Sequence, residues 1–393
     1  MLIKGEELFK KLSQKEPTAG VAKSRAFEIL GVTCVRGNTD VDNGVRNALR
    51  VLDSVDRLDI PVYRGCDHSI IPPDFQHNFF HGRDGFGDIP DLPEVTNTKV
   101  QNEHAVNMMY HSVCKYPNKV DFILLGPLTN FAVCINMYGQ DFLDKLGNIY
   151  IMGGNYRGKG NVTKSAEFNF MLDPEAAHIV FESIKKPMVV VPWETCIDGE
   201  MNIDLDWRFE VLGQVDSKAV RLMNAVENAF LRPLGYAKWI VCDAMAVVSF
   251  LFPNMTIVKS RLYHATIELA GRHTRGQMVL DHKRKDQGNT RVIMDLHKEN
   301  YRKILSWTGG LITDEEIKEM FLNSCVKSRL YHATIELAGR HTRGQMVLDH
   351  KRKDQGNTRV IMDLHKENYR KILSWTGGLI TDEEIKEMFL NSC

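Results

Sequence analysis

The feature that most constrains the fold is the alternation of short apolar runs with amphipathic stretches of helical length between residues 25 and 325. Strands buried in a parallel sheet are apolar on both faces and are joined by crossover helices. The pattern therefore predicts βαβ units, which means an α/β fold with a mostly parallel central sheet and helices on both faces. We expect strands at 27–35, 60–65, 121–125, 148–154, 187–194, 262–270 and 290–296, and helices at 41–55, 103–116, 129–139, 174–184, 217–234, 243–252 and 297–307.

Composition narrows the class of protein. The 393 residues include 50 basic and 50 acidic side chains, and a net charge of zero argues against a nucleic-acid-binding protein. The first residues carry no apolar leader, and no run approaches about 18 uninterrupted apolar residues, so we expect no membrane partner. The eight cysteines form no CxxC pair, which favours reduced thiols and a cytoplasmic location.

An internal repeat sets the domain boundaries. Residues 258–325 recur letter for letter at 326–393. Two identical copies do not suggest a solenoid, which stacks several diverged units. One sheet has room for one such unit, so the second copy must exchange between molecules, dock elsewhere or remain unpacked. Either a recent duplication or an error in gene assembly explains the presence of two identical copies. We expect an atypical N-terminal segment at 1–24, the main domain at 25–325 and the copy at 326–393.

A polar loop marks the expected ligand-binding edge. Asn161, Glu167 and Asn169 lie within nine residues, between an apolar run that ends in two glycines and a helix that Asp173 can cap. Small ligands bind at this edge of open α/β sheets, so the loop is a candidate site. The alternative is a surface loop followed by a capped helix. The GPLTN turn at 126–130 likewise offers Thr129 or Asn130 as a helix cap.

Seven segments, in order, resemble the inosine–uridine-preferring nucleoside hydrolase family, in its cysteine-containing subgroup. They are GVTCVRGN (31–38), HGRDGFG (81–87), LLGPLTNFA (124–132), IMGGN (151–155), NVTKSAEFNFMLDPEAA (161–177), WIVCDAMAV (239–247) and ELAGRHTRGQ (268–277). The resemblance implies an enzyme that hydrolyses purine or pyrimidine ribonucleosides to ribose and base with the help of a bound calcium ion. It also implies a small-molecule ribonucleoside as the partner and a homo-oligomeric assembly.

The resemblance also implies site residues. Asn161 and Glu167 correspond to groups that bind the ribose 5′-hydroxyl, Asn169 reaches the 2′/3′ side, and Asn38 and Met152 line the same pocket. The hydroxyls of ribose need fixed polar partners, since a buried group left unpaired costs about 1–3 kcal/mol.

Asp243 and the backbone carbonyl of Leu125 correspond to calcium ligands, although Asp243 could instead cap the helix that follows it. Cys242 occupies the place where some members carry a histidine that protonates the leaving base. A thiol with a pKa of about 8.5 is a weak acid, and we favour a packing role for it. We expect His81 to be structural or to line the pocket rather than to act in catalysis.

The N-terminus departs from the family pattern. The family opens with a strand and an Asp-rich loop, D-x-D-x-x-x-D-D, which supplies most calcium ligands. Here no aspartate precedes Asp40, and Asp40 and Asp42 open a helix, where we interpret them as caps. The first strand and the Asp-rich loop are therefore expected to be missing, with an incomplete calcium site and impaired activity. The alternatives are a non-catalytic ribose- or nucleoside-binding protein, or a mis-assembled gene product.

Overall fold

The computed structural model of the chain describes residues 2–5, 27–73, 79–95, 100–198, 201, 203–283, 285–314 and 316–317. The chain divides into two units, Met1–Gly5 with Thr18–Ile312 and Glu6–Pro17 with Thr313–Cys393, and every helix and strand described below lies in the first. The copy at 326–393, the expected boundary at 325 and most of the segment at 1–24 lie outside the described residues.

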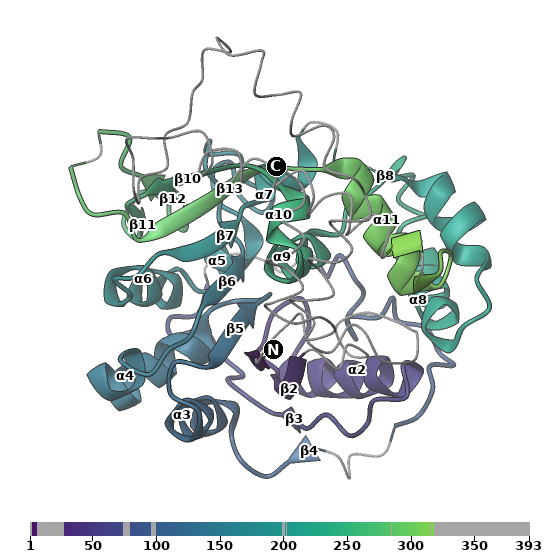
Figure 1. Cartoon of the computed structure of the whole chain (residues 1–393), viewed down its shortest axis with the longest axis horizontal. Coiled ribbons are helices and arrows are strands. Elements are labelled where there is room, and N and C mark those ends of the chain that lie inside the picture. The colour runs from purple at the N-terminus through teal and green to yellow at the C-terminus, as the bar shows by residue number, and fades with distance from the viewer. Residues whose placement is uncertain are drawn as a thin grey trace, which may run out of the picture. The chain divides into compact units, whose positions relative to one another are not determined.

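A nine-stranded sheet with the order β10-β13-β7-β6-β5-β1-β2-β3-β4 forms the centre of the first unit (Figure 1). Its members are β1 (Leu2–Gly5), β2 (Phe27–Thr33), β3 (Val62–Tyr63), β4 (Val100–Gln101), β5 (Val120–Leu124), β6 (Ile149–Met152), β7 (Met188–Val191), β10 (Ile257–Tyr263) and β13 (Thr290–Leu296). All neighbours pair in parallel except those of β1 and β10. The expected α/β architecture is confirmed.

Helices cover both faces of this sheet, as β6 shows. Ile149 and Ile151 point into the core shared with α4 and α6, whereas the Tyr150 ring between them meets Phe250 of α9 with centroids 5.0 Å apart. This alternation follows from the two-residue period of a strand. The long helices are α2 (Val41–Ser54), α3 (Ala105–Lys115), α4 (Thr129–Leu143), α6 (Pro174–Ser183), α8 (Lys218–Phe230), α9 (Cys242–Leu251) and α11 (Lys298–Gly309).

Shorter elements connect these parts. They are α5 (Phe168–Leu172), α7 (Trp193–Ile197), α10 (Pro253–Thr256), the π-helical turn Trp207–Val211, the 3-10 turn Leu212–Gln214, and the pairs β8 (Ile203–Asp204) with β9 (Lys238–Trp239) and β11 (Ala265–Ile267) with β12 (Met278–Leu280). No helix among the described residues is long and apolar enough to span a bilayer.

The expectation that the first strand is missing is wrong, because β1 fills the place between β5 and β2. It runs antiparallel to both neighbours, with Ile3 opposite Ile29 and Asp121. An empty position there would leave the facing N–H and C=O groups of β2 and β5 without partners, a cost that pairing with β1 removes.

The expected strand at 262–270 is two strands, β10 and β11, which belong to different sheets. Asn289 fixes the break from within the protein. Its Oδ1 accepts a hydrogen bond from the N–H of Ala265, and its Nδ2 donates to the carbonyls of Phe181 and Ala265. A buried amide that satisfies three backbone groups at a break holds the chain in one path.

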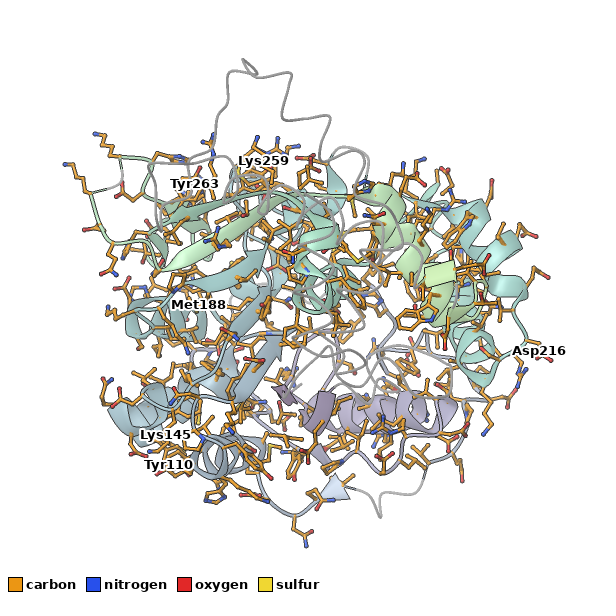
Figure 2. The ribbon with its side chains drawn as sticks, viewed as in Figure 1. Tyr110, Lys145, Met188, Asp216, Lys259 and Tyr263 are labelled. Carbon is orange, nitrogen blue, oxygen red and sulfur yellow. The ribbon has the colours of Figure 1, made fainter. Side chains whose placement is uncertain are left out.

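Polar contacts on the surface join α3 to the end of α4. The Tyr110 hydroxyl donates to Asp141 at 2.8 Å, and Lys145 pairs with the same carboxylate (Figure 2). Tyr110 also stacks on Tyr138, with ring centroids 3.7 Å apart. These contacts lie away from the strand ends and belong to the packing of two neighbouring helices.

Candidate functional site

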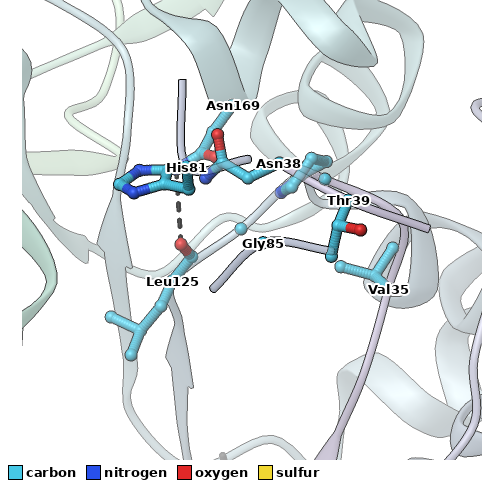
Figure 3. A pocket seen from close by; sticks show the side chains of 10 residues that line it. Val35, Asn38, Thr39, His81, Gly85, Leu125 and Asn169 are labelled. Carbon is cyan, nitrogen blue, oxygen red and sulfur yellow. Dashed lines mark hydrogen bonds between the residues drawn. The ribbon is translucent and has the colours of Figure 1, made fainter. Parts of the chain in front are cut away.

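Segments that follow three parallel strands meet helix α5 at one edge of the sheet. They are the segment after β2, the segment between β3 and β4, which carries His81 and Gly85, and the turn after β5, while α5 supplies Asn169. A cavity of about 310 Å³ lies between them (Figure 3). It is lined by Val35, Gly37, Asn38, Thr39, His81, Gly85, Leu125, Gly126, Pro127 and Asn169. The structure thus brings together three of the predicted site residues: Asn38, Leu125 and Asn169.

Asn169 is held in the wall of this cavity by its amide nitrogen. Its Nδ2 donates to the carbonyl of Leu125 at 3.4 Å (Figure 3). It also donates to the carbonyl of Met152 at 3.1 Å, and the Met152 sulfur lies 3.4 Å away. The side chain is only 6% exposed, so its orientation is fixed by these partners. Met152 therefore lies directly behind Asn169 rather than among the lining residues.

Glu167 makes backbone contacts at the base of the site. Its carboxylate caps α5 and accepts hydrogen bonds from the N–H groups of Gly154, Asn169 and Phe170. Burial raises its pKa to about 7, although these three bonds oppose the rise. Glu167 thus links the glycine pair Gly153–Gly154, which follows β6, to helix α5, which carries Asn169.

Asn161 lies apart from this group. It is exposed on the loop between β6 and α5, where its backbone N–H donates to the carbonyl of Ala166 at 3.2 Å. It is not among the residues that line the cavity.

The first turn of α9 carries Cys242 and Asp243. The Asp243 side chain is in contact with solvent. Protein nevertheless surrounds its carboxyl group closely, and the resulting loss of hydration raises the pKa of Asp243 to about 7. The helix is capped by the backbone of Val241 and not by the Asp243 side chain, so the capping alternative is wrong. Asp243 also raises the pKa of Glu167, which indicates that the two carboxyls face the same region.

The Cys242 thiol lies beside the buried thiol of Cys196 on α7, whose Sγ donates to the carbonyl of Pro192 at 3.6 Å. The interaction with Cys196 and burial raise the pKa of Cys242 well above its ordinary value, so the group is a neutral thiol at neutral pH. The Tyr301 hydroxyl packs beside them and donates to the carbonyl of Val241 at 3.0 Å. These contacts favour a packing role for Cys242.

His81 lines the cavity, which is one of the two roles expected for it, but the aromatic side chains that pack against it were not predicted from the sequence. The His81 ring, which lines the cavity, packs edge-on against Phe80 and Phe230, with centroids 4.8 and 4.9 Å away. Phe80 also meets Tyr236, at 5.9 Å. Burial lowers the pKa of His81, which keeps the ring neutral. The aromatic pair Phe79–Phe80 before the HGRDG motif was the available signal, but its partners lie about 150 residues later in the chain.

The described residues do not fit a calcium ion. Calcium binds six to eight oxygens, and the predicted ligands among the described residues are the Asp243 carboxyl and the Leu125 carbonyl, which already accepts a bond from Asn169. Within the described ranges, no group of three or more His, Cys, Asp or Glu side chains could hold a metal ion. β1 ends with Gly5 opposite Phe27, at the start of β2 and away from the cavity.

Fold and cavity together define an α/β protein with a cavity at the carboxyl ends of its parallel strands, the edge at which open α/β sheets bind ligands. The profile of the inosine-uridine preferring nucleoside hydrolase family matches residues 18–303. The chain belongs to this family of hydrolytic enzymes.

Individual relatives agree with this assignment. The chain is 28% identical over 304 residues to an inosine-uridine preferring nucleoside hydrolase of Crithidia fasciculata, covering 73% of this chain and 89% of the relative. It is 29% identical over 290 residues to the pyrimidine-specific ribonucleoside hydrolase RihA of Escherichia coli, covering 72% and 90%. Among solved structures, an inosine-guanosine nucleoside hydrolase matches with a TM-score of 0.67 and 28% identity, over 74% of this chain and 93% of that one.

Proposed function

We propose that the cavity binds the ribose of a ribonucleoside, with a purine or pyrimidine base, and that hydrolysis of its N-glycosidic bond by this chain is slow. The observation that carries the proposal is the convergence of Asn38, Leu125 and Asn169 on one cavity from the segment after β2, the turn after β5 and helix α5. Amide side chains and a backbone carbonyl are suitable partners for sugar hydroxyls, which both donate and accept hydrogen bonds.

The aromatic side chains beside the cavity, His81 with Phe80 and Phe230, would recognise the base of the nucleoside. A ribose between Asn38 and Asn169 places its base toward His81, where Phe80 and Phe230 support the ring. A flat, apolar heterocycle packs well against such a wall, whereas a free sugar gains nothing from it. We therefore expect tighter binding of nucleosides than of ribose.

Slow turnover follows from the state of the carboxyl groups. Cleavage passes through a positively charged, oxocarbenium-like sugar and needs an activated water. Both oxygens of Glu167 accept backbone N–H bonds, and Asp243 belongs to no group of three or more His, Cys, Asp or Glu side chains among the described residues that could hold a metal ion. Neither residue is arranged to activate water, so binding is retained better than catalysis.

Calorimetry tests the proposal. Titration of the protein with inosine should release heat, and 2′-deoxyinosine should bind more weakly because it cannot satisfy the amides on the 2′/3′ side. Absence of heat with inosine, uridine and ribose would remove the binding function. Robust release of ribose with excess calcium would instead show that the chain is an efficient hydrolase.

A nucleoside-binding protein without hydrolysis is the second candidate function. It is favoured by the same use of Glu167 as a structural acceptor. Homo-oligomeric assembly, implied by the family resemblance, and a cytoplasmic location, suggested by the cysteine pattern, are also part of the proposal. Light scattering and fractionation of cells test them.

A further inference from the structure

Thr129 and Asn130, in the first turn of α4, were expected to cap this helix but make other contacts. The helix follows Leu128 with no side-chain cap. Thr129 instead donates to the buried carboxylate of Asp173 at 2.6 Å. Asn130, which is 6% exposed, turns toward the loops after β2 and β3.

Asn130 joins these two loops through both ends of its amide. Its Oδ1 accepts a hydrogen bond from the N–H of Cys66 at 2.7 Å, and its Nδ2 donates to the carbonyl of Cys34 at 2.9 Å. The loops also bond directly to each other, since the N–H of Arg36 donates to the carbonyl of Cys66. The amide therefore extends strand-like pairing past the ends of β2 and β3.

Gly65 makes room for this bridge. A Cβ atom at position 65 would lie 2.3 Å from both Asn130 Oδ1 and the Cys34 carbonyl oxygen. Only glycine lets the backbone approach the amide this closely. The fit is too tight for the bridge to move without moving the loop that begins at Cys34.

That loop is the wall of the cavity. Immediately after Cys34 the chain supplies Val35, Gly37, Asn38 and Thr39 to the lining. On the opposite side, the turn that precedes α4 supplies Leu125, whose carbonyl is bonded to Asn169. Asn130 is therefore the direct side-chain link between the wall carrying Asn38 and the wall carrying Leu125 and Asn169.

We propose that Asn130 is a positioning residue for the cavity, which sets the separation of Asn38 from Asn169 without touching the ligand itself. The affinity measurement that tests this inference rests on the proposed nucleoside-binding function, whereas the hydrogen–deuterium exchange measurement does not. Polar groups must be held to a fraction of an ångström for a ligand to bond to several of them at once.

The test is Asn130→Asp with Asn289→Asp as its matched control. In Asn130→Asp the acceptor for Cys66 remains, but an oxygen replaces the donor that faces the Cys34 carbonyl, so the loop must shift. Asn289 is also a buried amide bonded to three backbone groups, and it touches no residue that lines the cavity. The same chemical change there costs stability without displacing Asn38.

Inosine affinity should fall about tenfold or more in Asn130→Asp and stay within about twofold of wild type in Asn289→Asp, each measured below its own melting temperature. Hydrogen–deuterium exchange of the 34–39 segment should accelerate only in Asn130→Asp. If Asn130→Asp does not fold, Gly65→Ala, which pushes on the same amide, replaces it with the same expectations.

Equal losses of affinity in the two Asp variants would overturn the inference, as would unchanged exchange at 34–39 in a folded Asn130→Asp protein. If the wild-type protein binds no inosine, the proposed function fails. The exchange measurement then still decides whether Asn130 holds the loop.

Discussion

Replacing Glu167 with glutamine should change how stability depends on pH. Burial raises the pKa of this carboxyl from 4.5 to about 7 in the folded protein. The folded state therefore holds a proton that the unfolded state releases between these values. Its contribution to stability is fully present below about pH 4.5 and is lost as the pH rises through about 7.

The magnitude follows from the size of the shift. At 1.36 kcal/mol per pKa unit, a rise from 4.5 to about 7 corresponds to about 3 kcal/mol, without a discount for solvent because the side chain is only 2% exposed. Glutamine is neutral at every pH and lacks this dependence. The free energy of unfolding of Glu167→Gln, relative to wild type, should therefore improve by up to about 3 kcal/mol between pH 5 and pH 8.

Urea denaturation followed by tryptophan fluorescence at pH 5, 6, 7 and 8 measures this difference directly. The comparison of the two proteins cancels the titration of every other group that they share. Parallel pH profiles for wild type and Glu167→Gln would refute the reasoning. A difference of opposite sign would show that the three backbone bonds outweigh burial.

Three further predictions concern the site, the glycine pair and the domain boundary. Asn169→Ala should weaken inosine binding by about tenfold, since it removes an amide from the cavity wall; calorimetry that shows unchanged affinity would contradict this. Gly154→Ala should lower the free energy of unfolding by about 2 kcal/mol or more, because the φ of Gly154 is +68° and a Cβ would lie 2.6 Å from the Phe170 ring. A urea midpoint equal to that of wild type would show that the Phe170 ring moves aside without a cost in stability. A chain that ends at Cys325 should unfold in one cooperative thermal transition, whereas a broad, non-cooperative transition would favour a mis-assembled product.

The sequence predicted the sheet well because strand and helix periods are local properties. Strands buried on both faces, such as β5, β6 and β7, are short apolar runs, and the helices between them carry strong amphipathic patterns. β1 was not foreseen, because four residues at a chain end carry too little pattern to indicate an antiparallel strand inserted between parallel ones.

The site was predictable only in part. Asn38, Leu125 and Asn169 line one cavity, because the carboxyl ends of parallel strands share one edge, but their roles stay a prediction. The backbone bonds of Glu167 depend on the path of the glycine pair, and those of Asn130 on two loops distant in sequence. Side chains that serve backbone groups far along the chain leave no periodic signal, so only the structure reveals them.

One nuclear magnetic resonance sample tests the central claim most directly. Inosine is mixed with the protein and excess calcium, and saturation transfer to the ligand is followed together with the appearance of free ribose and hypoxanthine signals. We expect transfer to both ribose and base protons, with negligible product over several hours. Rapid conversion of inosine would contradict the proposal of slow turnover, and absence of transfer would contradict the proposal that the cavity binds the sugar.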